Sequence, residues 1–246
     1  AELGVGNLIG SNLIDLTLIT GIFIVMSKGI KLKEKHFESD SWYMVAGIIL
    51  MMILYFIGDS LSRIDGAILI FFFIFNTIRM IHKRKKYFKR ETKKQKIKEE
   101  IKIEKTSFIF LLVLIVLFFS SSFMVKYASL IAVELNISQM IIGLFLVSLA
   151  TTIPELMFGI NAVMLKHSSM SIGDQDGAVL LKITLILGIM ALISPISIDL
   201  FIFSVGAMIV SALLFAYFVR TGRELSLKEG ITLVFFYVLF VILEIF

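Results

Sequence analysis

Long apolar runs, separated by short polar segments, make up most of this chain. The runs are continuous and do not alternate, which favours membrane-spanning helices over the strands of a barrel. Most are close to the roughly 20 residues that a helix needs to cross a bilayer. The pattern therefore predicts an all-α polytopic membrane protein. We predict eight spans, at residues 7–27, 42–58, 64–81, 107–135, 139–165, 173–193, 198–219 and 229–246.

Composition agrees with this pattern, since 58% of the 246 residues are hydrophobic. The formal net charge of +5 is misleading, because residues 81–105 alone hold twelve Lys and Arg and four Glu. The basic character is thus one loop, and we expect no nucleic-acid partner. The absence of cysteine excludes disulfides and thiolate metal sites. The segment Asp174-Gln-Asp176-Gly177 lacks the remaining spaced ligands of a calcium-binding loop.

The positions of the basic residues predict the orientation of the spans. Twenty-one of the 24 Lys and Arg follow the first, third, fifth or seventh span. By the positive-inside rule this side is cytoplasmic, and both ends of the chain face outward. We expect three parts: a first membrane block at 1–81, a basic cytoplasmic linker at 82–105 and a second membrane block at 106–246.

The fifth span carries an acidic residue, Glu155, deep in apolar sequence. It follows three hydroxyl residues and a proline: Ser148, Thr151, Thr152 and Pro154. On a helix the hydroxyls share the face of the glutamate, and the proline removes a backbone donor, so we expect the helix to break there. Carboxylate, hydroxyl and carbonyl oxygens are ligands that Na⁺ or Ca²⁺ prefers. The alternative is a kinked helix whose glutamate hydrogen-bonds to a neighbouring helix.

An internal repeat relates the first and sixth spans. Residues 6–22 align with residues 173–189 without gaps, and eight of the seventeen positions are identical. The identities include a threonine and three glycine pairs: Gly6 with Gly173, Gly10 with Gly177, and Gly21 with Gly188. The charge rule independently gives the two spans opposite orientations. Related segments of opposite polarity are typical of inverted-repeat transporters, although glycines also simply let helices pack closely.

Three charged residues are predicted to lie near the middle of the membrane: Asp15, Glu155 and Lys182. Asp15 and Lys182 occupy equivalent positions of the repeat, about eight or nine residues into their spans. An unpaired charge at this depth costs a few kcal/mol or more. We therefore expect these side chains to pair with one another or with ions.

These motifs resemble those of sodium/calcium exchangers of the calcium/cation antiporter superfamily, especially the small prokaryotic members. Gly6-Asn7-x-x-Gly10-Ser11-Asn12-x-x-Asp15 is similar to the end of the first repeat of that family. Thr151-Thr152-Ile153-Pro154-Glu155 is similar to its second-repeat motif. The resemblance implies ten helices in two inverted halves. Eight are expected here, with the first two family helices missing from a partial sequence.

The resemblance also implies the cation-binding residues. Glu155 and Asp15 would be metal ligands, with Thr151, Thr152, Ser11 and Ser148 as further oxygen ligands. The sixth span departs from the family pattern: Ala178, Val179 and Lys182 stand where polar ligands are expected, and Asp174 replaces the usual Asn. A buried Lys182 would act as a tethered cation beside Glu155 or Asp15. Alternatively, it only locks the helices together, and transport has been lost.

The function implied is a secondary antiporter that exchanges Ca²⁺ for Na⁺ or H⁺ by alternating access. The alternative is an exchanger-derived membrane protein, a scaffold or regulator, that has lost Ca²⁺ transport or carries a different cation. We expect no enzyme activity, no catalytic residues and no cofactor. The expected partners are the lipid bilayer and inorganic cations, and the expected location is a prokaryotic cell membrane.

Overall fold

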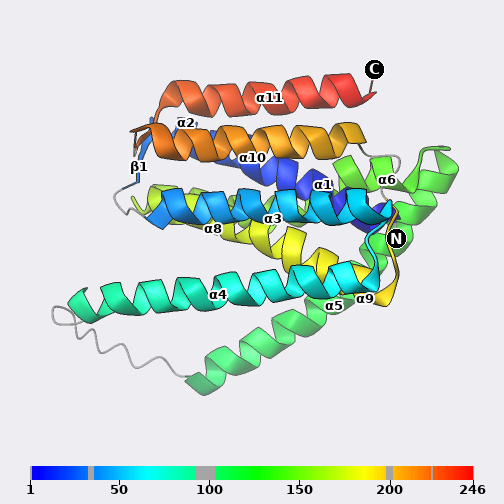
Figure 1. Ribbon diagram of the computed structural model, residues 1–246, viewed down its shortest axis with the longest axis horizontal. Helices are drawn as coiled ribbons and strands as arrows, with labels where there is room; N and C mark the ends of the chain where they lie inside the picture. The colour runs from blue at the N-terminus through cyan, green and yellow to red at the C-terminus, as the bar shows by residue number, and fades with distance from the viewer. Residues whose placement is uncertain (1, 33–35, 92–102, 198–201, 223, 246) are drawn as a thin grey trace.

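The computed structural model describes residues 2–32, 36–91, 103–197, 202–222 and 224–245 (Figure 1). Almost all of these residues are helical, and three short π-helical segments, labelled η, interrupt the longer helices. In chain order the elements are α1 (Glu2–Ile14), η1 (Asp15–Ile19), α2 (Thr20–Met26), β1 (Ile30–Lys31), α3 (His36–Gly58), α4 (Arg63–Glu91), α5 (Ile103–Glu134), α6 (Gln139–Ile141), η2 (Ile142–Val147), α7 (Ser148–Met164), α8 (Ser168–Leu181), η3 (Lys182–Ile186), α9 (Leu187–Ile193), α10 (Ile202–Gly222), β2 (Glu224–Leu225) and α11 (Leu227–Ile245).

Six helices within the described residues are long and apolar enough to cross a membrane. They cover Glu2–Met26, Ser39–Gly58, Arg63–His82, Gln139–Met164, Ser168–Ile193 and Ile202–Arg220. The prediction of an all-α, multi-pass membrane protein is confirmed. The remaining two predicted spans, 107–135 and 229–246, coincide with helices α5 and α11, and that these two cross the membrane stays a prediction.

Successive helices run back and forth along the long axis of the bundle (Figure 1). The loops that follow α2, α7 and α10, and the far end of α4, lie at one end of the bundle. The described residues next to these basic segments therefore lie at one end of the bundle, and that this end is cytoplasmic stays a prediction. Of the linker predicted at 82–105, α4 and α5 cover the flanks, and residues 92–102 lie outside the described part of the chain.

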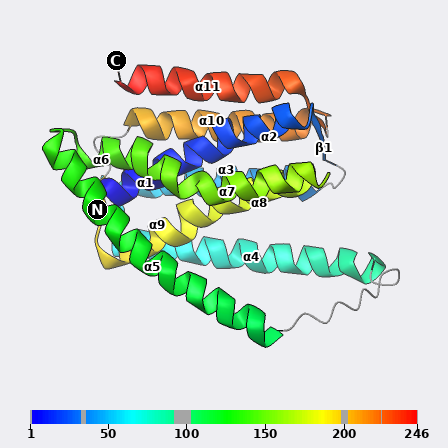
Figure 2. The same cartoon turned by 180° about the vertical axis from the view of Figure 1, so that it is seen from behind.

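The continuous helix formed by α1, η1 and α2 lies at the centre of the bundle. Within an apolar stretch of 18 residues of this helix, 83% is buried inside the protein. The helix contacts α7, α8, α10 and α11. A helix that is apolar on all sides is expected to be enclosed in this way. The helix α8–η3–α9 runs in the opposite direction in both views (Figures 1 and 2) and contacts this central helix along α2, η1 and α1.

The internal repeat is preserved in backbone geometry. The π-helical segments η1 and η3 begin at equivalent positions of the repeat, Asp15 and Lys182, and have the same length. In both, a threonine hydroxyl donates to the carbonyl oxygen four residues earlier: Thr17 to Leu13, and Thr184 to Leu180. Repeated sequence thus produces the same local widening of the helix twice, in helices that run in opposite directions.

Two short backbone pairings repeat the same relation at opposite ends of the bundle. At one end β1 pairs with β2 in antiparallel register, Ile30 opposite Leu225. At the other end Leu61 and Ile196 form an antiparallel bridge. All four side chains are buried. The first pairing joins the loop after α2 to the loop before α11, and the second joins the loop after α9 to the loop before α4. The two halves of the chain are therefore connected at both ends of the bundle.

Glycines mark where the repeat helices meet their outer neighbours. A Cβ atom added to Gly66 of α4 would lie 2.5 Å from the carbonyl oxygen of Gly188 in α9. A Cβ atom added to Gly21 of α2 would lie 2.7 Å from the carbonyl oxygen of Gly230 in α11. Small residues let helix backbones approach closely. Because Gly21 and Gly188 are equivalent in the repeat, these contacts are further evidence for the inverted arrangement.

Candidate cation site

The three charged residues predicted at mid-membrane meet in the structure. The Nζ atom of Lys182 lies 2.7 Å from Oδ2 of Asp15 and 3.4 Å from Oε1 of Glu155. The Asp15 side chain is fully buried, whereas those of Lys182 and Glu155 are 14% and 23% exposed. Among the three, the acid from the first repeat helix is thus the one shielded from solvent.

The positions of the three side chains follow from the elements that carry them. Asp15 begins η1 and Lys182 begins η3, so each sits where its repeat helix widens. Glu155 comes from α7, which contacts both α1 and α8. Single π-helical turns inside α-helices occur frequently at functional sites. The two repeat helices run in opposite directions, and their equivalent side chains, Asp15 and Lys182, meet where the helices contact each other.

The cluster carries a net negative charge. With both carboxyl groups ionised, two carboxylates and one ammonium leave one negative charge without a counterion. Lys182 donates a hydrogen bond to Oδ2 of Asp15, while Oδ1 of Asp15 is buried without a hydrogen-bond partner among the described residues. A buried ion pair is maintained only when its geometry offsets the cost of desolvating both charges. The arrangement therefore retains an acceptor oxygen for a further proton or cation.

Three hydroxyl groups lie within about two turns before Glu155 on α7. Thr151 donates to Oδ1 of Asn7 at 2.9 Å, which connects α7 to α1. Thr152 donates to the carbonyl oxygen of Ser148 at 2.9 Å, and Ser148 donates to the carbonyl of Leu144. Because each hydroxyl proton is used within the protein, the hydroxyl oxygens present lone pairs, as cation ligands do.

On the first repeat helix, the predicted residues Ser11 and Asn12 are buried close to Asp15 in sequence. Ser11 donates to the carbonyl oxygen of Leu8 at 3.2 Å. Asn12 is fully buried, and neither its Nδ2 nor its Oδ1 has a partner among the described residues. Asn12 entered the sequence analysis only as a repeat position, and its buried amide could have been suspected from its place in a central apolar helix.

The expectation that the helix breaks at Pro154 is wrong. α7 runs from Ser148 to Met164 with Pro154 inside it. The irregular backbone lies about two to three turns earlier, in η2 (Ile142–Val147). A single missing N–H removes one bond of the ladder, and the remaining bonds on either side hold the helical path. Backbone carbonyls for an ion are therefore not freed by a break at this position.

The repeat glycines differ in their surroundings. Gly6 and Gly10 of α1 pack against the backbone of the segment from Met140 to Leu144. Gly177 in α8, the repeat equivalent of Gly10, has no atom within 4 Å of the position that a Cβ would take. Gly173 and Asp174 also lie in α8. Asp174 is close enough to interact electrostatically with Glu155 and Lys182.

No group of three or more His, Cys, Asp or Glu side chains that could hold a metal ion occurs within the described residues.

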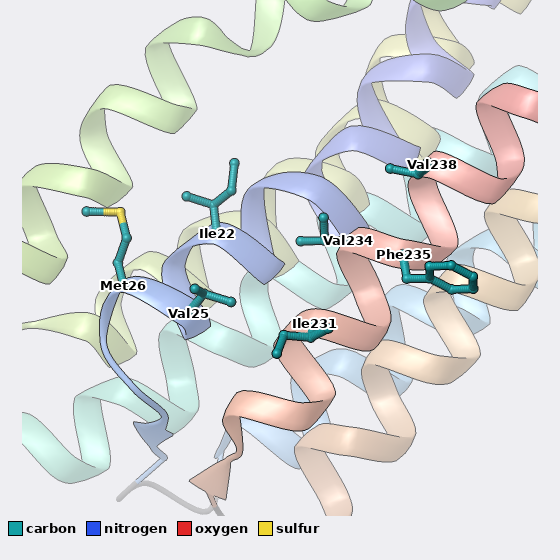
Figure 3. A pocket seen from close by; sticks show the side chains of 7 residues that line it. All are labelled: Ile22, Val25, Met26, Ile231, Val234, Phe235 and Val238. Carbon is teal, nitrogen blue, oxygen red and sulfur yellow. The ribbon is translucent and has the colours of Figure 1, made fainter.

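The apolar groove shown in Figure 3 is a separate feature. It has a volume of about 480 Å³ and lies between α2 and α11. Its lining is entirely apolar: Ile22, Val25, Met26, Ile231, Val234, Phe235 and Val238. None of these side chains offers a cation ligand.

Comparison with known proteins gives a family match. The family model described as sodium/calcium exchanger protein matches residues 1–81 and 105–246. The chain is 33% identical over 125 residues to the sodium/calcium exchanger MaX1 of Methanosarcina acetivorans, covering 50% of this chain and 35% of MaX1. It is 24% identical over 204 residues to the inner membrane protein YrbG of Escherichia coli, covering 80% of this chain and 62% of YrbG. The matched parts thus span less than two thirds of either relative.

Solved structures of the sodium-calcium exchanger NCX_Mj have the same fold. For crystals soaked with 10 mM Na⁺ and 10 mM Sr²⁺, the TM-score is 0.71 at 22% sequence identity. The alignment covers 98% of this chain and 76% of that structure. For crystals soaked with zero Na⁺ and Ca²⁺, the TM-score is 0.66. At this identity the likeness establishes the architecture alone.

Proposed function

Because the chain belongs to the sodium/calcium exchanger protein family, we propose that it is a secondary-active cation antiporter working by alternating access. Members of this family are transporters and not enzymes. The exchange proposed is Ca²⁺ against Na⁺ or H⁺. The observation that carries the proposal is the meeting of Asp15, Glu155 and Lys182 at the crossing of the two repeat helices. Substrate sites of inverted-repeat transporters lie near such an interface, at the midplane of the membrane.

Lys182 acts in this proposal as a tethered cation. Its ammonium group occupies a position between two carboxylates that would otherwise attract a mobile ion. With one positive charge fixed in place, the site needs fewer mobile charges to become neutral. This favours a reduced number of Na⁺ ions, coupling to H⁺, or weakened Ca²⁺ binding. Glu155, Asp15, Thr151, Thr152, Ser11 and Ser148 are the proposed ligands.

A second candidate function is supported by the same lysine. Lys182 joins η1, η3 and α7 through two ion pairs, and such links would resist the helix movements of a transport cycle. Ala178 and Val179 also lack the polar groups that Ser11 and Asn12 carry at the equivalent positions of the repeat. On this account the protein is an exchanger-derived scaffold or regulator without Ca²⁺ transport, or a carrier of another cation.

Ion uptake into proteoliposomes separates the two functions. The full-length natural protein would be reconstituted, and Ca²⁺ uptake followed under an outward Na⁺ gradient and then under a H⁺ gradient. Uptake under either gradient supports the antiporter and identifies its driving ion. If folded protein, verified by size-exclusion chromatography, gives no uptake under both gradients, Ca²⁺ exchange is excluded and the second candidate function stands.

Replacing Lys182 tests the tethered-cation role directly. In Lys182→Asn the fixed charge is removed, so the dependence of transport on Na⁺ or H⁺ concentration is expected to become steeper as a mobile ion takes its place. Lys166→Asn is the matched control, because Lys166 is exposed in the α7–α8 loop. An unchanged ion dependence in Lys182→Asn would eliminate the tethered-cation role.

A further inference from the structure

A second buried carboxylate lies outside the Lys182 cluster. Asp176 of α8 is only 5% exposed. Its Oδ2 accepts a hydrogen bond from the hydroxyl of Ser41 in α3 at 3.3 Å. Its Oδ1 is buried without a hydrogen-bond partner among the described residues. The cation-exchange mechanism proposed above makes no use of this carboxyl group.

The internal repeat shows that this acid is not part of the shared architecture. The residues equivalent to Gln175 and Asp176 in the first repeat are Leu8 and Ile9. All four side chains are buried, so α8 carries two polar side chains where α1 carries two apolar ones. Burying an uncompensated polar group is unfavourable in proteins, and burying a charged one is more so. A feature with this cost indicates a role for the carboxyl group.

The nearest charges do not neutralise Asp176 fully. Asp40 of α3 and Arg79 of α4 are close enough to act on Asp176 electrostatically. Arg79 is already committed: it forms an ion pair with Asp40 at 2.6 Å and lies 3.4 Å above the ring of Tyr43. The one cation of this group is thus matched by Asp40, and the charge of an ionised Asp176 would be in excess.

Other charged groups that face α8 are engaged elsewhere. Among the residues whose side chains the structure describes, the elements packed against this helix also carry Asp15, Glu155, Lys182 and Lys31, and α8 itself carries Asp174. The first three form the cluster described above, and Lys31 is exposed. None of the ion pairs among the described residues includes Asp176, so a bound proton would remove a charge that these pairs leave uncompensated.

We propose that Asp176 is a proton-binding site, in which Ser41 holds one carboxyl oxygen and a proton occupies the other. A metal ion fits poorly, since hard cations require about six oxygen ligands and Ser41 is the side chain that hydrogen-bonds to this carboxyl group. The proton comes from solvent and forms an O–H bond with Oδ1. Asp40 and Arg79, which are 19% and 13% exposed, mark the side from which it enters.

This site is mechanically linked to the tethered cation. Asp176 precedes Lys182 by six residues on the same continuous helix. Loss of the proton would leave a buried charge between α3 and α8 and weaken their contact, whereas protonation restores it. Proton binding would thereby bias the position of the helix that carries Lys182. The proton site stands whether or not the protein exchanges Ca²⁺.

Infrared spectroscopy of the purified full chain tests the proposal without any transport assay. A protonated carboxyl group has a carbonyl stretching band that a carboxylate lacks. At neutral pH we expect wild-type protein to show such a band, Asp176→Asn to lose it, and Asp59→Asn to keep it. Asp59 is an exposed acid in the loop after α3. A spectrum of Asp176→Asn that is identical to wild type in this region would overturn the proposal.

Two further measurements guard against a misfolded variant and against a metal site. Ser41→Ala removes the hydrogen bond to Oδ2, so the Asp176 band is expected to shift in frequency. An unshifted band in Ser41→Ala contradicts the proposed geometry, even if Asp176→Asn fails to fold. Addition of Na⁺ or Ca²⁺ at fixed pH should leave the band in place. Loss of the band on adding either ion would identify Asp176 as a metal ligand and overturn the proposal.

Discussion

The two repeat helices have the same backbone and different chemistry. Both widen into a π-helical segment at the same repeat position, and both use a threonine hydroxyl to bind the carbonyl four residues earlier. Yet the first presents Ser11, Asn12 and Asp15, whereas the second presents Ala178, Val179 and Lys182. The first helix is also more enclosed: 83% of an apolar stretch of 18 residues is buried in it, against 44% of the corresponding stretch in the second.

The difference separates the positions that build the bundle from those that define the site. Positions that contact another backbone are identical in both repeats, as Gly21 and Gly188 are. Positions that carry polar side chains in the first repeat have changed in the second, and the change from Asp15 to Lys182 inverts a charge. Because the two charges are opposite, the equivalent residues of the two repeat helices form an ion pair with each other. The following variants test this division.

The largest effect is expected from removing the acid of the ion pair. Asp15→Asn leaves the ammonium of Lys182 in the interior with Glu155, 3.4 Å away, as its remaining ion-pair partner. Breaking a buried ion pair on one side costs about 3–5 kcal/mol, because the remaining charge is uncompensated. We expect a corresponding loss of stability in thermal unfolding in detergent.

A double variant provides the control for this loss. Asp15→Asn combined with Lys182→Met removes both charges and should recover most of the stability, since an apolar replacement of a whole buried pair is often neutral. If the double variant is no more stable than Asp15→Asn alone, the stranded lysine is not the cause, and the loss comes from Asp15 itself or from Glu155, which has lost its ion-pair partner.

A smaller effect is expected at the equivalent glycines Gly10 and Gly177. A methyl group at Gly10 would collide with the backbone of Leu144, so Gly10→Ala should cost about 1–3 kcal/mol through overpacking. The same change at Gly177 meets nothing within 4 Å. Since glycine inside a helix is less favourable than alanine, Gly177→Ala should gain about 0.5–1 kcal/mol. Thermal unfolding of residues 1–246 measures both.

The opposite result at Gly177 would also be informative. If Gly177→Ala costs as much as Gly10→Ala in the full-length natural protein, a backbone packs on this face of α8 as η2 packs on α1. The two repeat helices would then be equally enclosed, and the difference in burial would not be a property of the whole molecule.

Apolar runs were sufficient to predict six of the eight expected spans, and the depth of the charged residues was sufficient to expect them to pair with one another or with ions. Residues 64–81 and 139–165 were predicted as spans, and helices occupy Arg63–His82 and Gln139–Met164. The repeat placed Asp15 and Lys182 at equal depth in opposite helices, which is why their pairing could be expected. The family resemblance is confirmed by the match over 1–81 and 105–246.

Other features had no readable signal in the sequence. In a π-helical segment the backbone hydrogen bonds shift by one residue, and no periodic pattern of apolar and polar side chains predicts such a shift. Pro154 was expected to break its helix, because the prediction considered this residue alone. The tertiary contacts that keep α7 continuous cannot be read from the sequence. Asp176 was compared only with a calcium-binding loop, and its partner Ser41 lies 135 residues away in sequence. The exchange of Leu8 and Ile9 for Gln175 and Asp176 within the repeat was the one available signal.

The smallest effects concern helix caps that the two halves share. Ser62 and Asp65 begin α4 with a reciprocal cap: the Asp65 carboxylate accepts from the Ser62 backbone N–H at 2.8 Å, and the Asp65 N–H donates to the Ser62 hydroxyl at 3.3 Å. Ser226 and Glu229 begin α11 in the same way, at 2.6 and 3.4 Å. This is the capping-box arrangement, and loss of such a serine typically costs about 1 kcal/mol.

Ser62→Ala and Ser226→Ala are therefore expected to destabilise the protein by similar amounts, each about 1 kcal/mol, in thermal unfolding. Ser→Thr at the same positions is the control, since threonine retains the capping oxygen. The Ser62 cap is partly buried and the Ser226 cap is exposed, so any difference should make Ser62→Ala the more costly. A larger loss for Ser226→Ala would mean that the halves differ in their scaffold as well as in their site, because water should replace an exposed cap more readily than a buried one.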